Sequence, residues 1–293
     1  TLFRSLALIS AVSTQQIPMR PLWKYLSPQN SSFPENSIHG YIPVDNLGND
    51  IFYWYFPSRD NPKTDPLVVW FTGGPGCSGS LGILTELGPF SVCKDGTGST
   101  VNNPYSWNSN ANLLFVDNPI GTGFSHAHRD DMSTTEKDVA ANMLTFFRIF
   151  MGLPPFNGFI DKPIYITGES YAGHYVPVVA SALRRSITPK YKVAGIAVGN
   201  GMISAASQFL GYATYSLANS KYTGMTQQQY DTIYPLLVQC EAMMKASLKA
   251  VSDRTFNYCW NMVKNIANGP DGQKKFNWYD IKLNCTEIGR AHV

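Results

Sequence analysis

The sequence Gly168-Glu169-Ser170-Tyr171-Ala172-Gly173 constrains the fold of this chain more than any other feature. An apolar run, residues 164–167, precedes it, and residues 175–185 can form a helix after it. In this G-x-S-x-G arrangement a serine occupies a strained turn between a strand and a helix, and small residues on either side let the turn close. A chain with 24 glycines can contain the pattern by chance, but the flanking segments favour a nucleophile elbow. We therefore predict that Ser170 is a nucleophile.

A second glycine-rich segment, Trp70 to Gly79, directly follows the strand-like residues 66–69. Glycines are costly unless the backbone needs a positive φ or must approach a ligand closely. Acyl transfer supplies that need, because backbone N–H groups must be fixed where the charge of an oxyanion develops. We expect the N–H groups of Gly74 and Tyr171 to form this oxyanion hole. A phosphate-binding loop is the alternative, but no Gly-Lys-Ser/Thr sequence follows.

Several separated blocks, taken in order, make the chain resemble the serine carboxypeptidases, a branch of the α/β-hydrolases. The resemblance covers roughly residues 35–285, and its blocks are 70–79, 86–89, 103–108, 115–119 running to 123–125, 168–177 and 199–201. It implies an α/β fold with a mostly parallel sheet, helices on both faces and a helical cap insertion. It also implies a hydrolase that releases C-terminal residues from peptides through an acyl-enzyme at acid pH.

The resemblance assigns a role to two acidic residues as well. In these enzymes two buried carboxylic acids that share a proton bind the terminal carboxylate of the substrate, and the matching positions are Glu86 and Glu169. Two carboxyl groups in contact cannot both ionise at low cost, so one pKa rises and a proton is available to bind a carboxylate. Trp70, Thr72 and Gly73 are expected to line the same site. For Glu86, a surface position on a helix is the alternative.

Thr72 departs from the common pattern of the family. Peptidases usually have Asn at this position, whereas Thr resembles the plant acyltransferase branch, which moves acyl groups from glucose esters to alcohols. That branch usually replaces the Glu before the serine by Asp, and this chain retains Glu169. The retained pair of carboxylic acids favours a peptidase. An acyltransferase and a non-catalytic short form remain as alternatives.

The general base is not evident in the sequence. In α/β-hydrolases an Asp and then a His follow the serine, and they orient and deprotonate it. Only two histidines follow Ser170: His174, on the nucleophile helix, and His292, in a tail that does not resemble the family. No later acid matches the catalytic Asp of the family. We therefore expect a chain that stops before the final strands, lacks both partners and is inactive alone.

Three segments are expected along the chain. Residues 1–16 resemble a partial signal peptide, because an apolar run ends in small residues, although a core helix is the alternative. Residues 17–203 would form the N-terminal part of the hydrolase core. Residues 204–293 would form a truncated cap, because helical stretches such as 226–249 follow Gly199-Asn200-Gly201.

Apolar runs and chain breakers predict the elements of the core. A long amphipathic helix is expected over residues 133–151. Because strands and helices alternate, we expect a mostly parallel sheet covered on both faces, with the first two strands as an antiparallel edge. The predicted strands are residues 40–43, 51–56, 67–71, 113–116, 163–167 and 193–198.

Cysteines and glycosylation sequences indicate the secretory pathway, with a secreted, vacuolar or lysosomal destination. An odd number of cysteines, 5, leaves at least one without an internal partner. Three of them are clustered in the sequence and predict a local disulfide, but the sequence does not show which two pair. The resemblance implies that the partner of Cys77 lies beyond the chain. The disulfide candidates are Cys77, Cys240, Cys259 and Cys285, and the glycosylation candidates are Asn30 and Asn284.

Composition argues against several classes of partner. The chain is 44% hydrophobic, which suffices for a buried core, and its charge of +3 comes without a Lys/Arg block, which argues against nucleic acid. No second apolar run reaches transmembrane length, so no membrane partner is expected. No Cys-x-x-Cys or His/Cys ligand spacing occurs, and no metal or cofactor is expected. Peptides with a free C-terminal carboxylate are the expected substrates, and a homodimer is left open.

Overall fold

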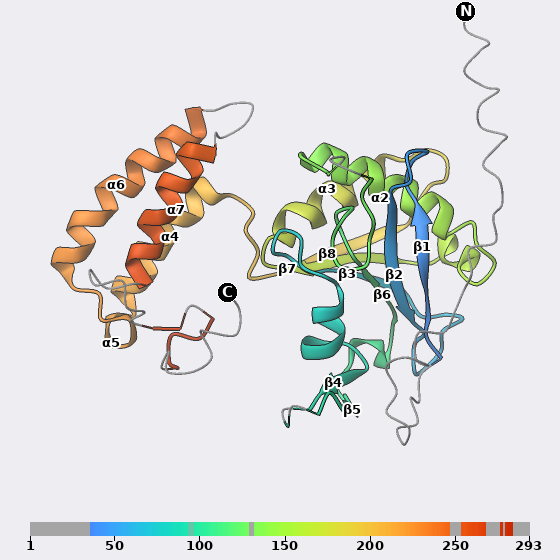
Figure 1. Cartoon of the computed structure of the whole chain (residues 1–293). Helices are drawn as coiled ribbons and strands as arrows, with labels where there is room; N and C mark the ends of the chain where they lie inside the picture. Colours follow the sequence, from blue (N-terminus) through green and yellow to red (C-terminus); the bar gives the residue numbers. More distant parts are fainter. Residues whose placement is uncertain are drawn as a thin grey trace, which may run out of the picture. The chain divides into compact units, whose positions relative to one another are not determined.

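The computed structural model describes residues 36–93, 95, 97–128, 132–246, 253–267, 276–277 and 279–283. The chain divides into two units, the first ending at Gly201 and the second beginning at Met202. Strands are found in the first unit, and the elements of the second are helices (Figure 1). The predicted signal segment and the candidates Asn30, Asn284 and Cys285 lie outside the described residues.

A six-stranded sheet organises the first unit in the order β1-β2-β6-β3-β7-β8. β1 pairs antiparallel with β2, and β2 pairs antiparallel with β6, whereas β6, β3, β7 and β8 run parallel. This arrangement confirms the α/β prediction and its antiparallel edge. The bounds are β1 (Ile38–Pro43), β2 (Asp50–Phe56), β3 (Leu67–Phe71), β6 (Asn112–Val116), β7 (Ile164–Glu169) and β8 (Val193–Gly199).

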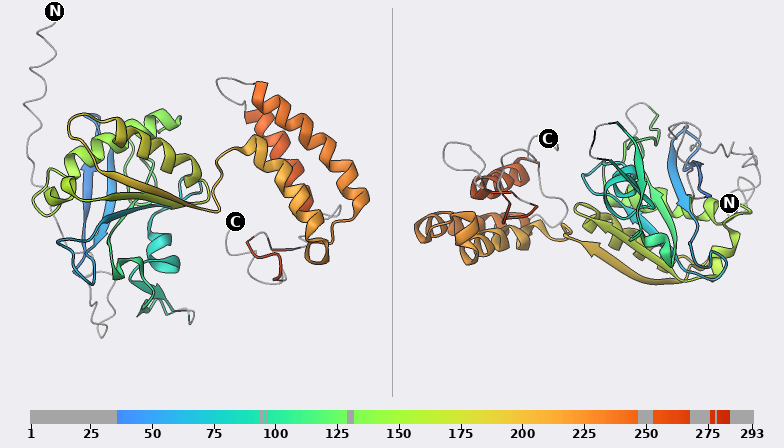
Figure 2. Two further views of the ribbon diagram at one scale, coloured as in Figure 1. Left: turned by 180° about the vertical axis from the view of Figure 1, so that it is seen from behind. Right: turned by 90° about the horizontal axis from the view of Figure 1, so that it is seen from below.

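Both faces of the sheet are buried around β2. Successive side chains of a strand point to opposite faces, and here Ile51, Tyr53 and Tyr55 join one hydrophobic cluster while Phe52, Trp54 and Phe56 join another. Helices α2 (Glu136–Phe150) and α3 (Ala172–Arg185) both cover the first of these faces (Figure 2). On the second face the described residues supply the short helix η1 (Gly82–Glu86) and the strand β4 (Phe90–Val92).

Helix α2 forms because its sequence carries both a cap and an apolar stripe. Thr135 Oγ1 accepts a hydrogen bond from the Asp138 N–H at 3.2 Å, and the Asp138 carboxylate accepts one from the Thr135 N–H at 2.9 Å. This capping box satisfies two donors at the helix end. The predicted apolar positions Val139, Met143, Phe146, Phe147 and Phe150 are all buried.

A hairpin of β4 (Phe90–Val92) and β5 (Thr100–Asn102) was not predicted from the sequence. Its strands are short, and Val92 and Val101 are exposed, so the alternation that marks a half-buried strand is weak. Three short helices were not predicted either: η1, η2 (Trp107–Ser109) and η3 (Asn157–Asp161).

The second unit consists of packed helices. Phe209, Leu237 and Val263 belong to its hydrophobic cluster. A disulfide joins Cys240 to Cys259, which resolves the open pairing of the local bridge, while Cys77 and Cys93 are free thiols. None of the helices in the described ranges is both long and apolar enough to cross a membrane. The bounds are α4 (Ala205–Ala218), α5 (Ser220–Thr223), α6 (Gln227–Ala246) and α7 (Asp253–Ala267).

Candidate active site

Ser170 occupies the turn between the end of β7 and the start of α3. Its φ is +61°, in the left-handed region that residues other than glycine rarely adopt. The Ser170 N–H donates to the Gly199 carbonyl at 3.0 Å, which fixes the turn to the end of β8. A side chain at Gly168 would meet Phe71 O at 2.6 Å and Ala172 Cβ at 2.7 Å. The turn therefore needs glycine at this position.

Helix α3 directs its N-terminus at this turn. Tyr171 is the N-cap residue, and the first N–H groups of a helix lack partners within the helix. Together with the helix dipole they favour negative charge at this point. The Tyr171 N–H is thus available at the position expected for one donor to an oxyanion.

The glycine-rich loop lies against the nucleophile turn. A side chain at Gly73 would meet Tyr171 N at 2.5 Å and Ser170 Cβ at 2.8 Å. Gly74 and Gly76 have φ values of +112° and +83°, and the Cys77 N–H donates to the Gly73 carbonyl at 3.1 Å. The loop therefore turns sharply, with its backbone close to Ser170, as the predicted oxyanion role of Gly74 requires.

Two carboxylic acids meet beside the turn. Glu86 is the last residue of η1, Glu169 is the last residue of β7, and a hydrogen bond joins their carboxyl groups. The Glu86 side chain is exposed over much of its surface, but its carboxyl group is partly desolvated. This desolvation, with the charge and the hydrogen bond of Glu169, raises the pKa of Glu86 to about 7. The pair can therefore hold a proton near neutral pH.

Trp70 and Thr72, which are expected to line the carboxylate site, lie close to each other and to η1. Trp70 and Thr72 are buried, and Trp70 Nε1 donates to Thr72 Oγ1 at 3.2 Å. A side chain at Gly82 would meet Trp70 Nε1 at 2.5 Å, so η1, which carries Glu86, packs closely on Trp70. The Thr72 hydroxyl keeps a free lone pair and a proton that can face a ligand.

Sequence reasoning missed one acid close to the Ser170 turn, Glu136. The Tyr171 hydroxyl donates to Glu136 Oε1 at 3.2 Å, and the Tyr171 ring stacks on His174 at 4.7 Å between centroids. Burial raises the pKa of Glu136, and burial with the Glu136 charge raises the pKa of Tyr171 to about 12. The sequence marks Glu136 only as the start of a helix, and the contact depends on the packing of α2 against α3.

The described part of the chain places no histidine in a hydrogen bond with Ser170. His174 stacks on Tyr171 instead, and His292 lies outside the described residues. Among the described residues there is also no group of three or more His, Cys, Asp or Glu side chains that could hold a metal ion.

A sequence model described as "Serine carboxypeptidase" matches residues 28–292 of the chain. The chain belongs to the serine carboxypeptidase family. "Carboxypeptidase Y homolog A" of Leptosphaeria maculans is 33% identical over 258 residues, which cover 84% of this chain and 44% of that protein. The protein of the same name from Paracoccidioides brasiliensis is 34% identical over 250 residues, again 84% of this chain and 44% of that protein. The chain thus spans less than half the length of these curated relatives.

A solved structure has the same fold. The crystal structure of Kex1(Δ)p, a prohormone-processing carboxypeptidase from Saccharomyces cerevisiae, superimposes with a TM-score of 0.65 at 26% sequence identity. The match covers 78% of this chain and 52% of that protein. The likeness supports the α/β-hydrolase fold predicted from the sequence.

Proposed function

We propose that the protein is a serine-type carboxypeptidase that acts on peptides with a free C-terminal carboxylate. The observation that carries the proposal is the hydrogen-bonded pair of Glu86 and Glu169 beside the Ser170 turn. A protonated carboxyl can donate to a substrate carboxylate, which an ionised one would repel. An esterase without this preference would have no use for such a pair.

The reaction follows from the geometry of the turn. Ser170 Oγ bonds to the carbonyl carbon of the last peptide bond, and its proton passes to a base outside the described residues. The Gly74 and Tyr171 N–H groups stabilise the oxyanion. The C–N bond then breaks, the nitrogen takes the proton, and the C-terminal amino acid leaves. Water hydrolyses the ester that remains on Ser170 and restores its hydroxyl.

The test uses the protein expressed from its full coding sequence and a blocked dipeptide, with the same dipeptide amidated at its C-terminus as the matched substrate. Glu86→Ala removes the donor to the carboxylate, so we expect KM for the free acid to rise by about 10-fold or more, as the loss of a charge-assisted hydrogen bond would cause. Hydrolysis of the amide should change little. Equal effects on both substrates would contradict the proposal. Activity in Ser170→Ala would contradict the assignment of Ser170 as the nucleophile.

An acyltransferase is the second candidate, because Thr72, which receives the Trp70 hydrogen bond, stands where peptidases of the family usually have Asn. Incubation with a glucose ester and an alcohol acceptor separates the two activities. We expect hydrolysis of the dipeptide and no ester transfer. Transfer without peptide hydrolysis would favour the acyltransferase.

We further propose a location in the secretory pathway. The Cys240–Cys259 disulfide supports it, because such bridges persist in oxidising compartments. Secreted, vacuolar and lysosomal destinations would be separated by fractionating cells that express the tagged protein. Recovery of the protein with cytosolic markers and reduced cysteines would contradict the proposal.

A further inference from the structure

Asp117, directly after β6, is an acid that the reaction above does not use. Its side chain is buried, with 1% of the residue's surface exposed. Burial raises the pKa of Asp117, although three hydrogen bonds favour its charged form. A buried carboxylate is costly unless donors surround it. The hydrogen bonds to this side chain must therefore offset the cost of burying it.

The two oxygens of the Asp117 carboxylate serve different loops. Oδ1 accepts hydrogen bonds from Ser78 Oγ at 2.8 Å and from the Gly79 N–H at 2.7 Å, both in the glycine-rich loop after β3. Oδ2 accepts one from the Phe124 N–H at 2.8 Å, in the loop after β6. One side chain thus connects the predicted oxyanion loop to a second loop.

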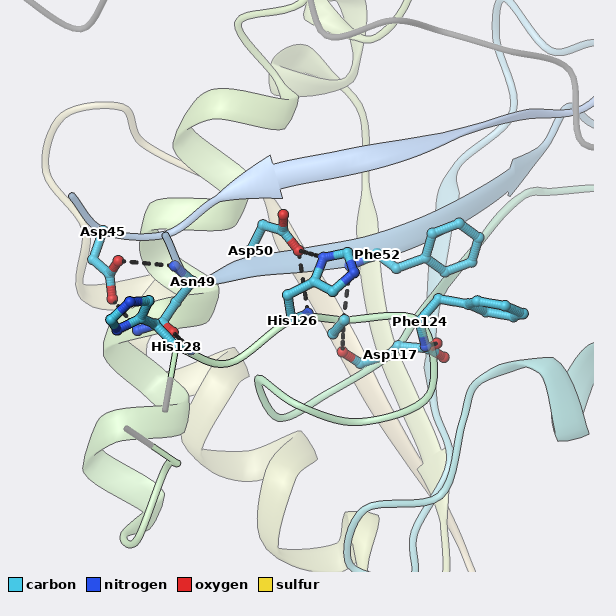
Figure 3. Close-up of polar contacts among 9 residues, drawn as sticks. Asp45, Asn49, Asp50, Phe52, Asp117, Phe124, His126 and His128 are labelled. Atoms are coloured by element: carbon cyan, nitrogen blue, oxygen red, sulfur yellow. Dashed lines mark hydrogen bonds and ion pairs between the residues drawn. The ribbon is translucent and has the colours of Figure 1, made fainter. Parts of the chain in front are cut away.

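That second loop is itself anchored to the sheet, as Figure 3 shows. Ser125 Oγ donates to the Asp117 carbonyl at 2.7 Å and accepts from the Phe52 N–H of β2 at 2.8 Å. His126 and Asp50 exchange two backbone hydrogen bonds of 3.1 and 3.2 Å, and the His126 ring contacts the Asp50 carboxylate at 2.9 Å. The loop that follows Asp117 is therefore held to β2 by these hydrogen bonds.

Glycines on both loops make room for the carboxylate. A side chain at Gly79 would meet Val116 O at 3.2 Å and Asp117 Oδ1 at 3.4 Å, and one at Gly123 would overlap the Asp117 carboxylate. Larger residues at these positions would push the loops away from Asp117. The close approach of both backbones is thus a built feature of the site.

The glycine-rich loop is held at its two ends. Its first end continues from β3, which pairs with β6 and β7 up to Phe71. Its second end is Ser78-Gly79, which two hydrogen bonds join to the Asp117 carboxylate. Between the ends lie Gly74 and Gly76, whose positive φ values glycine adopts more readily than other residues.

We propose that Asp117 is a positioning residue, which holds the Gly74 N–H in oxyanion geometry by fixing Ser78 and Gly79. The inference rests on the proposed function, since it takes Gly74 as an oxyanion donor. Donors stabilise a transition state only if they are already oriented, and losing one typically costs about 100- to 1,000-fold in kcat. A donor that is retained but no longer held should cost less than this.

The test compares two serines that each donate to an aspartate, in the protein expressed from its full coding sequence. Ser78→Ala removes the contact with Asp117. Ser58→Ala is the matched control, because buried Ser58 likewise donates to an aspartate, Asp65 Oδ2, at 2.5 Å. Ser58 lies near the start of β6, whereas Asp117 follows the end of this strand. We expect similar losses of Tm in both variants. Only Ser78→Ala should lower kcat, by about 10-fold, with KM for the blocked dipeptide unchanged.

A peptidyl trifluoromethyl ketone gives a second readout, because its adduct with Ser170 carries an oxyanion. Its Ki should rise in Ser78→Ala by the same factor as kcat falls, and should stay at the wild-type value in Ser58→Ala. Asp117→Asn, which keeps the shape but turns an amide N–H toward one set of donors, should lower kcat further. Wild-type kcat and Ki in Ser78→Ala would overturn the proposal. Equal inactivity of wild type and Ser170→Ala would show instead that the proposed function is wrong.

Discussion

The carboxyl edge of the sheet contains two acidic sites that are built in contrasting ways. Asp117 is surrounded by donors from two loops, so its oxygens are occupied by the protein itself. Glu86 faces another carboxyl group, that of Glu169, which raises the pKa of Glu86 to about 7 together with desolvation. The first arrangement joins two backbone segments, and the second holds a proton that, in the proposed function, is donated to a substrate carboxylate. The protonation of a carboxyl group thus depends on whether donors or another acid surround it.

Removing the Asp117 carboxylate should have the largest effect on stability. Asp117→Ala leaves the Ser78 hydroxyl and the N–H groups of Gly79 and Phe124 without their acceptor, and each buried unpaired group costs about 1–3 kcal/mol. We expect the free energy of unfolding in urea to fall by about 3 kcal/mol or more. Asp161→Ala, at an exposed acid 3.7 Å from Lys192, is the control and should stay within about 0.5 kcal/mol of wild type. A loss under about 1 kcal/mol for Asp117→Ala would contradict the structural role given to Asp117.

The Glu86–Glu169 pair should instead reveal itself in the pH dependence of binding. The raised pKa means that Glu86 is protonated below about 7 and loses its proton above it. KM for a free-acid dipeptide should therefore rise with pH above that value, by about 10-fold per unit. Glu86→Gln carries an N–H donor at every pH, so its KM should be nearly constant from about pH 6 to 9. A wild-type KM that stays flat, or a variant that follows the wild-type curve, would contradict this role.

Substitution of Glu136 should give the smallest effect. Among the described residues its carboxylate has one donor, whereas that of Asp117 has three and the carboxyl group of Glu86 faces another acid. One oxygen accepts from the Tyr171 hydroxyl and the other, Oε2, is buried without a partner in the described structure. Glu136→Gln keeps an acceptor but loses the charge, so we expect kcat to fall by about 3-fold, as for a weakened hydrogen bond. The exposed neighbour Lys137→Ala is the control. A kcat at the level of this control would show that Tyr171 does not depend on Glu136.

Periodicity and local motifs were enough to predict the strands of the sheet and the elements around Ser170, but not η1, which carries Glu86. The apolar stripe of α2, the six strands and the strand-turn-helix around Ser170 follow from rules that act over a few residues. The hairpin of β4 and β5 was missed, because its short strands leave Val92 and Val101 exposed and show no alternation.

Contacts between distant segments were beyond the reach of such rules. Glu86 and Glu169 were paired only through the resemblance to a family, since nothing in their spacing brings η1 to the end of β7. Asp117 lies in one of the family blocks, residues 115–119, but the sequence did not reveal its contacts, because its two loops meet only when β3 and β6 pair. Glu136 was missed since its partner, Tyr171, comes from the packing of another helix. Tertiary neighbours decide the role of each of these acids.

The left-handed backbone at Ser170 limits which residues evolution or design could use at the position of the predicted nucleophile. Threonine carries the same hydroxyl, but its branched β-carbon disfavours a φ of +61°. Cysteine is unbranched and would fit the same turn with a different reactive atom. The fold therefore permits a change of element, from oxygen to sulfur, more readily than the addition of one methyl group.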